Sequence, residues 1–302
     1  MTVTQRHPLE VKPRPFIEIS DSQVKLFQTC PRSWAYQKLL KIQPEEDRWN
    51  LYFGSGVHKG LEVLHLGNTL EAASRAAEEE CAKGAPSDQE MGAKAKAMIY
   101  GYATHFYPQY QQNWQTTACE AWWEYFPDPL VKMRGSRDNE SVARIDPTHW
   151  GVYDFKTTGQ IDGGDLGKNI GRNHQLSLYA VSKYRECGQW PKEQGLIFLR
   201  KPRHKTANAW IQQAREDHSL YSMRSEPFGP AEAWYALAVE QEMVATGKQM
   251  YALARAFDIH GAAALDLAVP NLNNCVVYNR LCGFAAGCHS CRPVHHVMLG
   301  RN

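Results

Sequence analysis

Aromatic and β-branched residues are concentrated between positions 117 and 158, and this composition predicts three or four antiparallel strands. Asp128-Pro129 and Asp146-Pro147 are typical turn sequences and divide the region. Farther along, the apolar run Leu-Ile-Phe-Leu at 196–199 predicts another core strand. A polar, glycine-rich segment at 159–173 lies between the two regions and predicts a loop.

Helical patterns flank these strands. Ser22 is a good N-cap for a helix, and Pro31 is placed to kink that helix or to begin a second one. Residues 58–114 are helical in pattern, with breaks at two glycine-containing turns. Two further helices are predicted at 175–184 and 231–257. The chain therefore predicts a fold that mixes helices with a sheet.

Composition narrows the class of protein. The chain has 302 residues, of which 43% are hydrophobic and 22% charged, and its net charge is +2. Such a chain can bury a substantial core. Its near-neutral net charge neither requires nor excludes the binding of nucleic acid. We find no run of 18 apolar residues and no apolar signal core at the N-terminus, so we expect a cytoplasmic protein without a membrane span.

The stretch Trp-Gly-Val-Tyr-Asp-Phe-Lys-Thr-Thr at 150–158 carries the main candidate chemistry. Side chains alternate along a strand, so Asp154 and Lys156 point to the same side. A carboxylate can hold a hard cation, and an adjacent ammonium can orient or help to deprotonate an attacking water. Asp138, on the preceding predicted strand, is placed to supply a second carboxylate. A solvent-facing salt pair is the alternative interpretation of an isolated D-x-K.

Eight cysteines in a chain without a secretion signal argue against a disulfide framework. Four of them fall between Cys275 and Cys291, and such a cluster in a reducing compartment usually holds a metal. Zinc is the first candidate, although Cys288-x2-Cys291 is the one pair with knuckle spacing. Histidines at 289, 295 and 296 keep zinc open.

The order of several short motifs adds a family resemblance. These motifs are Ser20-x-Ser22 with Cys30-Pro31, then Gly-Ser-Gly-Val-His at 54–58, Asp154-x-Lys156, Gln-Leu-Ser-Leu-Tyr at 175–179, and the cysteines from 275 to 288. Together they resemble the RecB-like branch of the PD-(D/E)XK nuclease superfamily in its iron–sulfur form. The helicase–nuclease AddB, the CRISPR-adaptation exonucleases and many phage exonucleases are similar.

The resemblance implies an α/β (α+β) fold. Its restriction-endonuclease-like core has a central mixed sheet flanked by helices, with a helical insertion and a C-terminal cysteine cluster. We expect a flexible arm at 1–15 and a single nuclease domain at 16–302. Within that domain we expect the helical insertion at 58–115, the catalytic core at 117–200, and a C-terminal helix and metal-cluster region at 228–302 that closes with Cys30.

The resemblance also implies a set of metal ligands. They are His58, Asp138, Asp154 and the backbone carbonyl of Phe155, and an imidazole among them favours Mn²⁺ over a strictly all-oxygen Mg²⁺ site. Asp146 competes with Asp138, although Asp146-Pro147 is more typical of a turn. A capping or packing role is the alternative for His58.

Three further residues complete the expected site. Lys156 is the catalytic cation, and Gln175 and Tyr179, four apart on one helix face, belong to its surroundings. The alternative is that Gln175 simply lies on the polar edge of an amphipathic helix. Glu120 and Glu124 flank two tryptophans on a predicted strand; one of them is a candidate near the metal, and salt pairing on the strand face is the more conservative interpretation.

A [4Fe–4S] cluster is the second cofactor that the resemblance implies. Its ligands would be the thiolates of Cys30, Cys275, Cys282 and Cys288, which would tie the two ends of the domain together. Many relatives have C-x2-C-x5-C instead, so Cys291 remains an alternative ligand. Zinc remains the alternative metal.

The resulting hypothesis is an Mg²⁺- or Mn²⁺-dependent DNA exonuclease of recombination, repair or phage DNA processing, acting on single-stranded or end-bearing DNA in a bacterial or phage-infected host cell. The alternative is a non-catalytic DNA-binding or scaffold protein with the same fold. A helicase, an annealing protein or a CRISPR integration complex would fit as partner.

Phosphate contacts are expected from the basic run at 200–205, and from Arg134, Arg137, Lys168 and Arg172. A solvated hairpin tip is the alternative for that run. Base stacking or core packing is expected of Trp34, Tyr36 and Tyr52.

Overall fold

The computed structural model describes residues 13–42, 49–159 and 168–271, together with 276–277, 280–281, 284 and 288. The chain divides into two compact units. The central unit comprises Asp47–Trp123 and Ser136–Val239, and the terminal unit comprises Met1–Glu46, Glu124–Gly135 and Glu240–Asn302. The expectation of one nuclease domain over 16–302 stays a prediction.

The main sheet has six strands: β1 (Ile17–Ile19), β2 (Trp114–Asp128), β3 (Val131–Ala143), β4 (Asp146–Thr158), β5 (Glu193–Arg200) and β6 (Tyr221–Pro227). In the central unit the strands are paired in the order β2-β3-β4-β5-β6. β4 runs antiparallel to β3 and parallel to β5, and β5 runs antiparallel to β6. In the terminal unit β1 runs parallel to the start of β3. The predicted mixed sheet is thus confirmed.

The helices are α1 (Asp21–Thr29), α2 (Pro31–Lys38), α3 (Trp49–His65), α4 (Leu70–Gly84), α5 (Gln89–His105), α6 (Tyr107–Asn113), α7 (His174–Cys187), α8 (Ala207–Glu216) and α9 (Pro230–His260). Short 3-10 turns, η2 (Ile170–Arg172), η3 (His218–Leu220) and η4 (Gly261–Leu267), and a hairpin of β7 (Val276–Val277) with β8 (Arg280–Leu281) complete the description. No described helix is long and apolar enough to cross a membrane.

Two predicted helix starts were wrong. The N-cap of α1 is Ser20 rather than Ser22, because the helix begins at Asp21. The helix predicted to begin at position 58 begins at Trp49, so the Gly-Ser-Gly segment lies inside α3. A Cβ on Gly56 would lie 2.3 Å from Sγ of Cys81 and 2.8 Å from the carbonyl oxygen of Ala77, so glycine lets α3 pack closely against α4.

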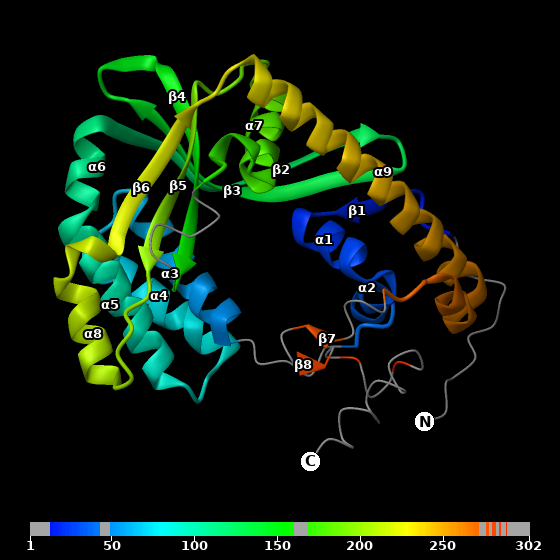
Figure 1. Cartoon of the computed structure of the whole chain (residues 1–302), viewed down its shortest axis with the longest axis horizontal. Coiled ribbons are helices and arrows are strands. Elements are labelled where there is room, and N and C mark those ends of the chain that lie inside the picture. The colour runs from blue at the N-terminus through cyan, green and yellow to red at the C-terminus, as the bar shows by residue number, and fades with distance from the viewer. Residues whose placement is uncertain are drawn as a thin grey trace. The chain divides into compact units, whose positions relative to one another are not determined.

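Strand alternation separates the core of the central unit from its polar face. Tyr153, Phe155 and Ile197 are buried with side chains of α3, α4, α5 and α8. Figure 1 shows these four helices grouped together at the lower left. Asp154 and Lys156 therefore point to the opposite face of β4, where α7 packs. α7 follows β4 and precedes β5, which is the helical crossover that two parallel strands require.

Close packing of α5 against α8 gives a test of the core. A Cβ on Gly101 would lie 2.0 Å from the carbonyl oxygen of Ala214, a rigid backbone atom. We expect Gly101→Ala to lower the free energy of unfolding by about 2 kcal/mol, because overpacking outweighs the gain in helix propensity. Chemical denaturation measures this change. Gly92→Ala on the same helix is the control, since its Cβ would approach the flexible side chain of Glu78 at 3.0 Å and backbone no closer than 3.7 Å, an ordinary contact. Equal stability of the two variants would contradict this packing.

Candidate active site

The candidate site lies where β3 and β4 stop pairing. Their ladder ends at Asn139 and Tyr153, and the next residue at this end of each strand is an aspartate, Asp138 on β3 and Asp154 on β4. These two side chains are 4% and 0% exposed. The backbone N–H of Phe155 donates to Oδ2 of Asp138 at 2.9 Å, so a carboxylate replaces the missing strand partner. Two carboxylates therefore lie in a buried fork of the sheet.

His58 approaches this fork from α3. Its Nδ1 lies 3.2 Å from Oε1 of Glu120 and 3.4 Å from Oδ2 of Asp138, and its Nε2 lies 3.0 Å from the carbonyl oxygen of Phe155. Burial alone would lower the pKa of His58. The charge of Asp138, the hydrogen bond and charge of Glu120, and the charge of Asp154 outweigh burial and raise that pKa to about 9. At neutral pH the metal-free site thus holds an imidazolium.

Lys156 occupies the other side of the fork. Its Nζ lies 2.6 Å from Oδ2 of Asp154 and donates to Oε1 of Gln175 at 2.8 Å. Burial, and next the charge of Asp138, raises the pKa of Asp154 to about 7 even though Lys156 and His58 oppose the shift. Lys156 and His58 therefore favour the ionised form of Asp154 against the effect of burial.

Tyr179 connects the two aspartates to α7. Its hydroxyl donates to Oδ1 of Asp138 at 2.6 Å, lies 3.3 Å from Oδ1 of Asp154, and accepts a hydrogen bond from Nε2 of Gln175 at 2.7 Å. The position of Gln175 is in turn fixed by Asn173, whose side chain caps the start of α7 by accepting from two backbone N–H groups. One chain of hydrogen bonds thus runs from Asp138 to Lys156.

Glu120 is the residue that the sequence pattern placed least well. It adopts a φ of +50°, which is uncommon for a residue with a side chain and costs conformational energy. This backbone places its carboxylate against His58, and Ser136 donates to its other oxygen at 2.9 Å. Glu124 instead pairs with Lys132 at 2.9 Å. Strand-face salt pairing is therefore correct for Glu124 and wrong for Glu120.

The donor set suits a hard divalent cation. Single ligand atoms of His58, Glu120 and Asp138 all lie within 4.8 Å of one another. Carboxylates, a carbonyl and one imidazole are ligands that Mg²⁺ and Mn²⁺ accept in proteins. The carbonyl of Phe155 is within hydrogen-bond distance of the same histidine, and Asp154 shares Tyr179 with Asp138. The structure thus brings His58 and Asp138 together with Glu120, whereas Asp154 lies next to this group and is paired with Lys156.

Arg137 has a different role from the predicted phosphate contact. It is 2% exposed, its Nε pairs with Glu140, and its NH2 group donates to both carboxylate oxygens of Glu186 at 2.8 Å. Lys183 also pairs with Glu140, at 2.8 Å. The phosphate prediction was wrong for Arg137, because burial in this ion-pair network leaves no surface for DNA. The network ties α7 to the strand that carries Asp138.

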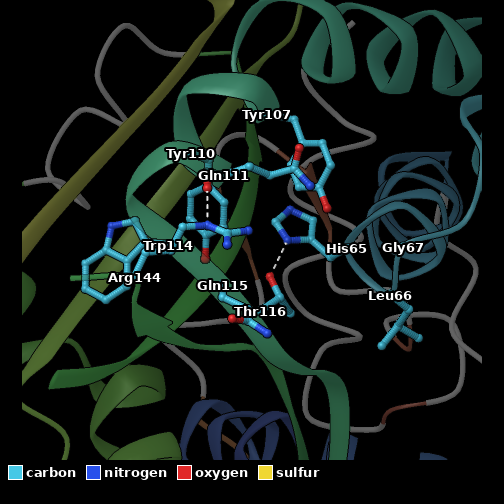
Figure 2. A pocket seen from close by; sticks show the side chains of 10 residues that line it. All are labelled: His65, Leu66, Gly67, Tyr107, Tyr110, Gln111, Trp114, Gln115, Thr116 and Arg144. Atoms are coloured by element: carbon cyan, nitrogen blue, oxygen red, sulfur yellow. Dashed lines mark hydrogen bonds between the residues drawn. The ribbon is translucent and has the colours of Figure 1, made fainter. Parts of the chain in front are cut away.

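A second histidine on α3 lies behind the site. His65 is buried, its ring lies 5.3 Å from that of Phe155, and its Nδ1 is 2.9 Å from the Thr116 hydroxyl (Figure 2). Burial lowers the pKa of His65 to about 3, so it stays neutral. Asn139 donates toward this ring at 3.1 Å. His65 also borders a pocket, whose lining side chains Figure 2 shows. The pocket has a volume of about 250 Å³, and none of the predicted site residues lines it.

The predicted basic run follows β5 and leads into α8, so it is not a hairpin tip. Lys201 is held in place: its N–H donates to the carbonyl of Thr158 at 2.7 Å, and its ammonium lies 5.1 Å from the ring centre of Phe53. Burial lowers the pKa of Lys201. The run therefore begins beside the end of β4, two residues beyond Lys156.

Trp34, a candidate for base stacking, is buried, which supports core packing rather than stacking on a base.

Two of the four predicted cluster ligands are described. Cys30 ends α1 and caps α2, and its thiol is half-buried and free. Cys288 is buried, and its backbone N–H donates to the carbonyl of Phe284 at 2.9 Å. Cys275 and Cys282, and the alternative Cys291, lie outside the described residues.

Comparison with known proteins completes this description. No curated protein matches the sequence. Among solved structures, a protein from Eubacterium rectale described as a "putative exonuclease" is similar, with 13% sequence identity, a TM-score of 0.47, and coverage of 91% of this chain and 87% of that chain. The family model described as the PD-(D/E)XK nuclease superfamily matches residues 18–289. The chain belongs to the PD-(D/E)XK nuclease superfamily.

Proposed function

We propose that this protein is a metal-dependent DNA exonuclease of the RecB-like branch, which hydrolyses phosphodiester bonds. The observation that carries the proposal is the pairing of Lys156 with a buried Asp154, within a cluster that also brings Asp138 and His58 together. A solvent-facing salt pair would not be buried. Membership of a nuclease superfamily supports the same reaction.

The proposed metal ligands are His58, Asp138, Asp154 and the carbonyl of Phe155, with Glu120 as an added ligand. Mg²⁺ or Mn²⁺ held there would neutralise the scissile phosphate, lower the pKa of a bound water and stabilise the leaving oxygen. His58 must give up its proton to act as a ligand. Asp138 is already oriented for this role by the Tyr179 hydroxyl and by the Phe155 N–H, and Asp154 contacts the same hydroxyl.

Lys156 is proposed as the catalytic cation. Its ammonium is held between Asp154 and Gln175, so its position is set before substrate arrives. A fixed positive charge beside the reacting phosphate stabilises the transition state more than the ground state. Gln175 and Tyr179 are positioning residues in this scheme, because they act on Lys156 and Asp138 through hydrogen bonds.

DNA binding is proposed at the end of the sheet where strands β4 and β5 terminate. The exposed residues Arg203, His204 and Lys205 follow Lys201 there. Such cations neutralise backbone phosphates without reading the sequence. Single-stranded or end-bearing DNA is the proposed substrate, and recombination, repair or phage DNA processing with a helicase, an annealing protein or a CRISPR integration complex is the proposed setting.

Loss of the central carboxylate tests the proposed hydrolysis. We expect Asp154→Asn and Lys156→Gln each to lower the rate of degradation of labelled linear DNA with Mn²⁺ by about 10²–10³-fold or more, because each removes charge from the reacting centre. Asp146→Asn on the same strand is the matched control and should keep wild-type activity, since Asp146 only caps its own turn through Thr148. Circular DNA distinguishes exonuclease from endonuclease activity. Equal rates for wild type and Asp154→Asn, or no degradation by either, would favour the non-catalytic DNA-binding alternative.

Competition between a proton and the metal gives a pH dependence. His58, with a pKa of about 9, binds a proton that the metal must displace at neutral pH. We expect the apparent affinity for Mn²⁺, measured anaerobically by calorimetry, to rise by about tenfold per pH unit between pH 7.5 and 8.5. His58→Asn should bind Mn²⁺ more weakly at pH 8.5 and with a shallower pH dependence. A wild-type affinity that does not change with pH would exclude His58 as a ligand.

We further propose that the terminal unit binds a [4Fe–4S] cluster through Cys30, Cys275, Cys282 and Cys288, with zinc as the competing metal. The half-buried free thiol of Cys30 and the buried side chain of Cys288 are compatible with ligation. Cys30 lies at the junction of two helices, so its ligation would fix the path of both.

Metal analysis tests this cluster. Anaerobically purified protein should be brown and contain about four irons per chain, as expected for one cubane. Cys288→Ser should lose iron and lower the midpoint of thermal unfolding, because cluster binding is coupled to folding. Cys187→Ser is the control, since this thiol is exposed and outside the proposed set. Colourless protein with stoichiometric zinc would contradict the iron–sulfur assignment.

A further inference from the structure

The terminal unit contains a pocket of its own. It has a volume of about 350 Å³ and is lined by the segment before α1, by α2 and the residues that follow it, and by β3. This volume is roughly ten times the share of one water molecule in the liquid. None of the candidate active-site residues lines it. The pocket is therefore a feature that the proposed catalytic chemistry does not explain.

Positive charge dominates the lining. Four of its side chains are cationic and one is acidic: Arg14, Lys38, Lys41 and Arg134, against Glu18. Glu18 pairs with Arg134 at 2.8 Å. Arg14 is likewise paired, with Asp258 at 2.7 Å, so the excess positive charge comes from Lys38 and Lys41. This excess attracts an anionic group and disfavours a cationic or purely apolar ligand.

Arg14 is held in a fixed position. Its Nε and NH2 groups donate to the two carboxylate oxygens of Asp258 at 2.8 and 2.7 Å, and its carbonyl accepts from the Tyr251 hydroxyl at 3.2 Å. A guanidinium held in this way loses little further side-chain entropy when it binds a ligand. It is therefore a preorganised element of the pocket wall.

Lys41 is held in an unfavourable conformation. Its φ is +59°, in the left-handed region that glycine or asparagine usually occupies after a helix. The next residue, Ile42, closes the turn by donating to the carbonyl of Tyr36 at 2.9 Å. A lysine at this position costs conformational energy that glycine would avoid, and such costs are concentrated at binding sites.

Trp34 supplies an independent observation. It is 1% exposed, it lines the pocket, and its indole N–H has no acceptor among the described residues. A buried donor without a partner is costly, and the cost disappears when a ligand supplies an acceptor. Oxygen atoms of an anion would provide that acceptor.

We propose that this pocket binds a phosphate group of a nucleic-acid strand, separately from hydrolysis at the candidate active site. Phosphate matches a lining that offers guanidinium and ammonium donors together with an unpaired N–H. The volume leaves room for the sugar attached to the phosphate. Assigning the phosphate to a strand rests on the proposed nuclease function, whereas anion binding by the pocket does not.

The test uses full-length protein with Asp154→Asn, so that DNA is not degraded. Calorimetry measures the binding of inorganic phosphate, of thymidine 5′-monophosphate, and of a short oligothymidylate with and without a 5′ phosphate. Lys41→Gly and Trp34→Phe are introduced into this background. Lys25→Gln is the matched control, because it removes one exposed positive charge from the same unit outside the pocket.

We expect Lys41→Gly and Trp34→Phe each to weaken oligothymidylate binding by about five- to tenfold, the usual effect of losing one charge-assisted hydrogen bond. Lys25→Gln should leave it unchanged. Lys41→Gly should also raise the midpoint of thermal unfolding, because glycine relieves the left-handed strain. Weaker binding of this variant would then not result from unfolding.

Three outcomes would overturn the proposal. If both pocket variants bind oligothymidylate as Lys25→Gln does, the pocket does not contact the strand. If they lose only inorganic phosphate and the mononucleotide, the pocket is a free-anion site. If no probe binds to the protein at all, it is not a phosphate site. Failure of the nuclease proposal is recognised separately, by equal degradation of DNA by wild type and Asp154→Asn in the presence of Mn²⁺.

Discussion

The burial of two neighbouring carboxylates is the constraint on which the rest of the site depends. Asp138 and Asp154 are almost completely excluded from solvent at the point where their strands separate. Burial, and next the charge of Asp138, disfavours the ionised form of Asp154 and raises its pKa to about 7. The arrangement is tolerable because cations approach it from two elements: His58 from α3 and Lys156 from β4 itself. Removing either cation would leave buried negative charge uncompensated.

This constraint explains why the two faces of β4 are so different. Tyr153 and Phe155 fix one face against the helical core, and their packing orients Asp154 and Lys156 toward α7. Phe155 has a double role, because its ring is part of the core while its N–H and carbonyl contact Asp138 and His58. The ion-pair network of Arg137 then holds α7 against β3. The positions of the charged groups are thus set by the packing of the aromatic rings and by the ion pairs of Arg137, which take no part in the proposed reaction.

Alternation along the strand was sufficient to predict that Asp154 and Lys156 share a face, and the strand–turn pattern was sufficient to place Asp138 on the neighbouring strand. Both properties depend on residues that are close together in the chain, so they can be predicted from the sequence. Glu120 could not be assigned in the same way, because its contact with His58 depends on a positive φ that the residue type does not indicate.

Strands β1 and β6 and helix α8 were also not predicted. β1 and β6 are short segments defined by partners distant in sequence. α8 follows the basic run, for which a hairpin tip was the structural alternative that we considered. Arg137 was misassigned for a related reason: exposure depends on the ion pairs that a folded chain makes.

A histidine in place of a fourth carboxylate has a physical consequence in this scheme. In the metal-free protein, the imidazolium of His58 and the ammonium of Lys156 face three carboxylates, those of Glu120, Asp138 and Asp154. A divalent cation that displaces the histidine proton adds one net positive charge, so the three carboxylates would be matched by the metal together with Lys156. A carboxylate at position 58 would instead leave the metal-free site with no proton-bearing group on α3 to offset Asp138. The proton on His58 therefore acts as a replaceable counter-charge, which stabilises the empty fork and is released when the metal binds.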